Sequence, residues 1–171
     1  MPFSLAAALR TLGIDHRSLE YVDAETSHEV ASIRHGAEPI LGICIGERVV
    51  LTASVDVTLE AGTTLDALGE KGFSGFGNTV TLELMGGRCD ARMEFAEESG
   101  KRLLSRVVVE QTVVLRDGST SELQRLGDGI IEVKGALARA RIVLGDWFRT
   151  ARLLADERTK GRGEPQHGMF G

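Results

Sequence analysis

Aromatic side chains are scarce in this sequence of 171 residues, which contains six phenylalanines, Tyr21 and Trp147. Proteins that bind single-stranded nucleic acid stack the bases on aromatic rings, so the scarcity argues against that function. The net charge of −5 argues against a general affinity for polyanions as well. We therefore expect no nucleic-acid partner.

Long apolar runs are missing too. No stretch reaches the roughly 18 apolar residues of a membrane span, and Arg10 interrupts the apolar residues near the start, so we expect neither a span nor a signal peptide. The two cysteines, Cys44 and Cys89, lie in apolar stretches and are expected to be reduced, buried thiols. These features predict a soluble cytoplasmic protein that does not bind membranes.

The motifs of common catalytic and metal sites are also absent. We find no phosphate-binding loop ending in Gly-Lys-Ser/Thr, no serine nucleophile motif and no zinc-ligand spacing. His28 and His35 are seven residues apart, whereas paired metal ligands on a helix usually lie about three or four apart. We therefore expect no metal and no cofactor.

Alternation of apolar and polar residues is the main positive signal. In residues 48–60 every second position is apolar, which predicts a half-buried strand with one polar, open face. Residues 40–45, 79–85, 88–95 and 102–115 are predicted to be further strands, with turns at 46–47, 86–87 and 97–101. The side chains expected in the core are Val55, Val57, Leu82, Met93, Phe95 and Val109.

Helices are predicted around these strands. Residues 4–12 and 26–35 are expected to form short helices, and Thr64 is expected to cap a third that contains Leu65 and Leu68. After Ser121 apolar residues recur at spacings of three and four, which predicts a long C-terminal helix. Gly135 weakens that pattern, so residues 130–134 could instead form a last strand.

Together these elements predict an α+β protein with a single domain. We expect residues 1–157 to form a curved antiparallel sheet of four to six strands, with the long C-terminal helix and the short helices on one face. Residues 158–171 are polar and rich in glycine, and we expect them to form a disordered tail.

Two groups of residues are candidates for a site. Glycine-rich loops let backbone N–H groups converge on a ligand, and one such loop carries the candidate ligand-binding residues Gly72, Phe73, Ser74, Gly75, Phe76 and Asn78. The catalytic role is unknown, with Asp56, Glu83, His28 and His35 as candidates for acid–base work. The alternative for the acidic residues is a solvated sheet face, with Arg92 and Arg106 as cross-strand partners.

Residues 46–115 resemble the strand region of hot-dog proteins, a family of acyl-thioester hydrolases and dehydratases. GERVVLTASVDVTLEAGTTL resembles a strand that ends in a glycine-bearing turn, and GGRCDARMEFAEESGKRLLSRVVVEQTVV resembles the long hairpin that follows it. The long buried helix of that family has no counterpart in residues 27–43, and residues 66–79 would be an insertion. The resemblance implies acyl-thioester chemistry but transfers no catalytic residue.

We expect a non-catalytic module that either binds a small ligand or mediates assembly. An apolar or acyl compound is the expected kind of ligand. The acyl-thioester enzyme is the alternative. A homo-oligomer, with a dimer as the default, is expected because Ile131, Ala138 and Ile142 form a second apolar stripe on the helix. Charge is also uneven: residues 1–100 hold 7 basic and 16 acidic residues, whereas residues 101–171 hold 13 and 9.

Overall fold

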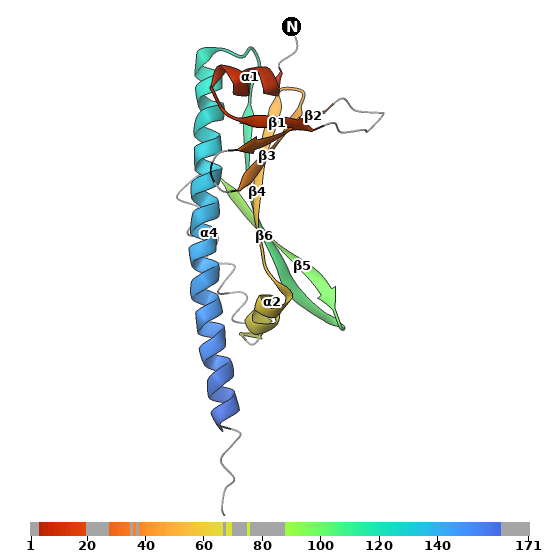
Figure 1. Ribbon diagram of the computed structural model, residues 1–171, viewed down its shortest axis with the longest axis vertical. Coiled ribbons are helices and arrows are strands. Elements are labelled where there is room, and N and C mark those ends of the chain that lie inside the picture. The colour runs from red at the N-terminus through yellow and green to blue at the C-terminus, as the bar shows by residue number, and fades with distance from the viewer. Residues whose placement is uncertain are drawn as a thin grey trace, which may run out of the picture.

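A computed structural model describes residues 4–19, 28–34, 36, 38–66, 68, 69, 75 and 88–161 (Figure 1). Its helices are α1 (Leu5–Thr11), α2 (Leu59–Asp66) and α4 (Thr120–Gly161). Its strands are β1 (His16–Leu19), β2 (Glu29–Arg34), β3 (Pro39–Ile45), β4 (Arg48–Asp56), β5 (Asp90–Glu98) and β6 (Lys101–Val114).

The six strands form one antiparallel sheet in the order β1-β2-β3-β4-β6-β5. Figure 1 shows the sheet curving away from α4, which runs along one side of it and continues past its end. The predicted α+β class, the antiparallel sheet and the long C-terminal helix are confirmed. Within the described residues, no helix is both long enough and apolar enough to span a membrane.

Strand β4 has the predicted alternation. Val49, Leu51 and Ala53 are buried against the helix side, whereas the intervening residues lie on the open face. Gly46, with φ of 60°, makes the tight turn from β3, and Ser99 and Gly100 make the turn between β5 and β6 with φ of 52° and 76°. Both hairpins lie where the sequence predicted them.

The predicted helix over residues 26–35 is wrong for the part that the structure describes. Residues 29–34 form β2, whose pairing with β3 runs from Glu29 opposite Cys44 to Arg34 opposite Pro39. Val30 and Ile33 are three residues apart, which suits a helix, but both are β-branched and fit a pleated surface better. They and Ala31 are buried, so this strand is covered on both faces. His35 lies outside the described residues.

The predicted helix cap at Thr64 is also wrong, because the chain leaves β4 earlier than expected. Thr58 caps α2, its hydroxyl accepting the Ala61 N–H at 3.2 Å. Leu59, the last apolar position of the alternating residues 48–60, is the first residue of α2 and is 58% exposed. Gly62 packs against β6: a Cβ at this position would lie 2.8 Å from the Leu104 carbonyl oxygen. The tight contact fixes α2 beside the sheet.

Helix α4 settles the choice between helix and strand for residues 130–134, which are helical. It also contains residues 158–161, the first four of the predicted tail. The face toward the sheet is apolar and buried through Leu126, Ile130, Val133, Leu137, Ala140 and Leu144. At Gly129 a Cβ would lie 3.0 Å from Val113 and 3.1 Å from Leu51, so glycine brings helix and sheet close together here.

Of the six predicted core residues, Val109 is fully buried. Four others are half-buried at the edge of the core, namely Val55, Val57, Met93 and Phe95. Leu82, the predicted strand 79–85 and the turn at 86–87 lie outside the described residues. The core is therefore centred on β4, β6 and the N-terminal half of α4, and the predicted residues near the end of β4 and in β5 lie at its edge.

Two glutamates tie the helices to the sheet. Oε2 of Glu122, in the first turn of α4, accepts the N–H groups of Arg116, Asp117 and Gly118 at 2.8–3.0 Å. Glu29, at the start of β2, accepts the N–H groups of Leu5 and Ala6 at 2.7 and 2.8 Å. Each carboxylate satisfies backbone donors that would otherwise have no partner.

Candidate functional site

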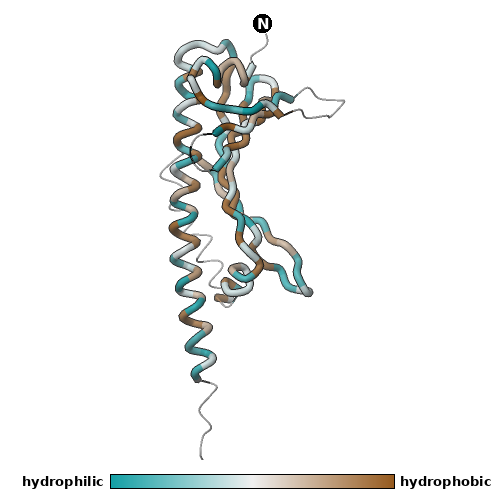
Figure 2. Tube along the Cα trace, in the orientation of Figure 1, coloured by the Kyte–Doolittle hydropathy of each residue, from teal (hydrophilic) through white to brown (hydrophobic). Residues whose placement is uncertain are grey.

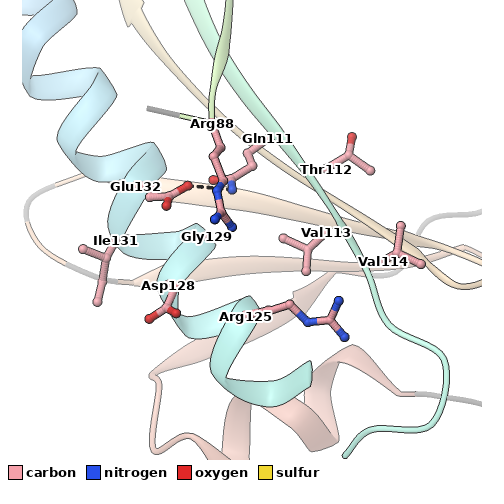
Figure 3. Close-up of a pocket in the computed structure, with 10 residues that line it drawn as sticks. All are labelled: Arg88, Gln111, Thr112, Val113, Val114, Arg125, Asp128, Gly129, Ile131 and Glu132. Carbon is pink, nitrogen blue, oxygen red and sulfur yellow. Dashed lines mark hydrogen bonds between the residues drawn. The ribbon is translucent and has the colours of Figure 1, made fainter. Parts of the chain in front are cut away.

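A cavity of about 510 Å³ lies between β6 and the N-terminal half of α4 (Figure 3). Its lining comes from the end of β6, from α4 and from the residue before Cys89: Arg88, Gln111, Thr112, Val113, Val114, Arg125, Asp128, Gly129, Ile131 and Glu132. Two of these side chains are basic and two are acidic, so the cavity carries mixed charge.

A short polar network forms the inner wall of this cavity. Gln111 is only 8% exposed, and its Nε2 donates to Glu132 at 2.8 Å, the contact drawn as a dashed line in Figure 3. The Cys89 thiol in turn donates to Gln111 Oε1 at 3.6 Å. Burial, and then the nearby Glu132 carboxylate, raise the pKa of the Cys89 thiol to about 11. The thiol is therefore protonated at neutral pH and is a poor nucleophile.

A second cavity, of about 660 Å³, lies on the open face of the sheet. Its lining includes Asp56, Arg106, Glu94 and Arg92. Together with the neighbouring Glu110 they form a ladder of alternating charges across β4, β6 and β5, which we call the charge ladder. Arg106 contacts Asp56 at 2.7 Å, and Arg92 contacts Glu94 and Glu110 at 3.2 and 3.1 Å. Hydrogen bonds to Glu94 and then to Glu110 raise the pKa of Arg92.

The third cavity is smaller, about 240 Å³, and mostly apolar. It lies where the end of β4 meets α2 and α4, and its lining includes Val55, Val57, Leu65, Leu144 and Phe148. A short apolar chain fits the chemistry of this lining better than that of the two polar cavities.

The two candidate catalytic residues that the structure describes, Asp56 and His28, lie far apart. Asp56 is part of the charge ladder and is paired with Arg106. His28 precedes β2 and is half-buried. The register places Glu29 opposite Cys44 and Cys44 opposite Val49, so His28 lies near the start of β4 and Asp56 at its other end. The eight steps from Arg48 to Asp56 separate them by roughly 26 Å along the strand direction. Glu83 and His35 lie outside the described residues.

Of the candidate ligand-binding loop, only Gly75 is described. A Cβ at Gly75 would lie 3.3 Å from the Trp147 ring, which places this residue against α4. Gly72, Phe73, Ser74, Phe76 and Asn78 lie outside the described residues.

The network around Gln111 was not predicted from the sequence. A signal was present, because Gln111 shares the strand phase of Val107, Val109 and Val113, all buried on the helix side. A polar residue on an apolar phase requires a buried partner. That partner is Glu132, on a helix whose register against the sheet the sequence does not reveal.

No protein-family model and no curated protein matches this chain. Solved structures, however, do match it. An uncharacterized protein from Methanothermobacter thermautotrophicus aligns with a TM-score of 0.63 and 17% identity, over 84% of this chain and 96% of its own. YbjN from E. coli, for which a role as a transcription regulator has been suggested, aligns with a TM-score of 0.47 and 16% identity, over 81% and 89%. At these identities the similarity to the archaeal protein shows that the fold is shared and nothing about function.

Proposed function

We propose that this protein is a non-catalytic assembly module that works as a homo-oligomer. The observation that carries the proposal is a row of exposed aliphatic side chains on α4. Ile131, Ile142 and Leu153 are 59%, 64% and 66% exposed. Their own sheet packs against the opposite side of the helix, so these side chains have no function in the fold of one chain. Large exposed apolar residues that lie together often mark an interface.

The open face of the sheet is a weaker candidate for the interface. The sequence places Val50, Leu104, Val108 and Val114 among the polar residues of this face. Leu104 and Val108 are buried within the chain itself, Val50 is half-buried and Val114 is 39% exposed. The rest of this face carries the charge ladder, whose charges are already paired. Desolvating such a face against a second protein would cost more than covering aliphatic side chains.

A small apolar or acyl ligand is compatible with this proposal, and the cavity between β4, α2 and α4 is where we would place it. Acyl-thioester catalysis ranks below a binding role. Asp56 is paired with Arg106, and the thiol of Cys89 is protonated at neutral pH, so neither supplies a free base or nucleophile.

The molar mass in solution tests the proposal. Gel filtration with light scattering at micromolar concentration should give a multiple of the 18.4 kDa chain. Ile142→Glu should reduce the mass to that of one chain, because it buries a charge in the interface. Thr150→Glu places the same charge on the same helix away from the row and should leave the oligomer intact. A mass of one chain for the unmodified protein at every concentration would rule out the proposal.

A further inference from the structure

We infer that the partner of this surface is a second copy of the same chain, whose α4 lies antiparallel to the first α4. The inference rests on the proposed function, because it names the partner and the geometry of the same surface. It starts from the spacing of Ile131, Ile142 and Leu153, which are 11 residues apart. Eleven residues make about three turns of an α-helix, so the three side chains lie in one straight row.

Small residues and one arginine fill the positions between these side chains. Arg149 lies in the row between Ile142 and Leu153 and is paired with Asp146 of its own helix. Gly135, Ala138 and Gly145 follow Ile131 at steps of four, three and seven, which keeps them on the same face of the helix. A Cβ at Gly145 would have no neighbour within 4 Å, so the backbone is open there. We call this face, from Ile131 to Leu153, the outer stripe. Small residues let a second helix approach closely, and the aliphatic side chains can then fit beside them.

The length of α4 favours the antiparallel arrangement. Through Lys160, no residue after Ala151 is buried, and Figure 1 shows this part of the helix extending past the sheet and α2. Figure 2 shows that apolar segments continue into this part. In an antiparallel pair centred near Ile142, Leu153 of each copy lies beside Ile131 of the other. The projecting C-terminal end of each α4 then lies on the N-terminal half of the other α4, which the sheet of that other copy supports from behind.

The size of the outer stripe is adequate for a dimer. A helix of 42 residues is about 63 Å long and about 10 Å wide, so a strip along it measures several hundred Å². Stable dimers bury roughly 800 Å² on each partner. The outer stripe with its two edges reaches that scale, but only if the helices overlap along most of their length. An antiparallel pair centred near Ile142 provides this overlap, since that residue lies near the middle of α4.

Cysteine cross-linking of the full-length protein distinguishes the arrangements. We would prepare Ile131→Cys and Leu153→Cys and oxidise each alone and as an equal mixture that has been unfolded and refolded together. The antiparallel pair predicts that each single variant stays uncross-linked, whereas the mixture forms a covalent dimer that a reducing agent cleaves. The unmodified protein is the control for the native thiols, both of which are buried with raised pKa values.

The other outcomes overturn the inference in separable ways. Cross-linking of each single variant with itself would mean a parallel pair. A dimer by light scattering without any cross-link would place the interface elsewhere and leave the proposed function standing. A single chain by light scattering would remove both. Circular dichroism and native mass of each variant before oxidation confirm that the substitutions themselves leave the fold and the dimer intact.

Discussion

The two faces of the sheet differ in what covers them and in what they contribute. One face carries Val49, Leu51, Val109 and Val113, all buried beneath α4. The other carries the charge ladder, whose side chains are between 36% and 74% exposed. Burial of apolar surface contributes far more to folding than exposed ion pairs do. The comparison indicates that one face holds the fold together, while the other can change with little effect on stability.

Two adjacent residues of α4 give the largest test of this difference. Ile130 is fully buried against the sheet, and Ile131, the next residue, is 59% exposed. Ile130→Ala should lower the free energy of unfolding by about 2–5 kcal/mol, because it leaves a cavity in the core. Ile131→Ala, measured where the protein is monomeric, should change it by less than about 1 kcal/mol. Urea denaturation measures both, and equal losses would contradict the helix orientation.

Two helical glycines give the second test, on the covered side. At Gly62 a Cβ would lie 2.8 Å from a backbone oxygen of β6, whereas at Gly127 the nearest atom, in Leu12, is 4.0 Å away. Gly62→Ala should therefore destabilise the protein by about 1–3 kcal/mol through crowding. Gly127→Ala should be neutral or stabilise it by up to about 1 kcal/mol, since alanine is the better helix former. Thermal melts of the two variants should shift in opposite directions or differ clearly in size.

The pH dependence of stability tests the buried polar network. The pKa of Cys89 is raised from its ordinary value of 9.0 to about 11, because the folded protein disfavours the thiolate. The protonated thiol favours the folded state over the unfolded state. Its contribution to stability is therefore complete below about pH 9 and is lost as the pH rises toward 11. Chemical denaturation at a series of pH values should show this loss. Cys89→Ala should flatten the slope in that window, and an unchanged slope would show that the thiol is not shielded.

The smallest effect is expected on the open face. Replacing Arg92 with Gln removes its contacts with Glu94 and Glu110, yet the Arg92 side chain is 58% exposed. We expect a loss below about 1 kcal/mol, and smaller still in about 1 M salt, because water and ions screen exposed pairs. A salt-independent loss of several kcal/mol in urea melts would mean that the open face is covered in solution.

The sequence predicted the elements that follow one simple period. Strand β4 alternates without interruption, and α4 repeats at three and four residues despite its glycines, so both were recognised. Strand β2 was missed because Val30 and Ile33 match a helical spacing and because Val30 on one face and Ala31 and Ile33 on the other are all buried. A strand covered on both sides has no alternation to read. Only its pairing with β3 identifies it.

The site was less predictable than the fold. Three of the contacts that matter join residues about 20 or more positions apart: Gln111 with Glu132, Cys89 with Gln111, and Asp56 with Arg106. Each depends on the register between two elements, which a single sequence does not encode locally. The outer stripe was partly visible, since Ile131, Ala138 and Ile142 were recognised as a second apolar row. Its exposure depends on which side of α4 the sheet covers, and the sequence alone does not show this.

Glu122 fixes the point at which the long helix starts. Its carboxylate accepts three backbone N–H groups from residues 116–118, just before α4 begins, and it holds Arg125 in the next turn at 3.3 Å. The buried residues from Leu126 to Ala151 then fix the direction of α4 along the sheet. The helix is thus a rigid support, and it carries its last ten residues, about 15 Å of helix, beyond the sheet.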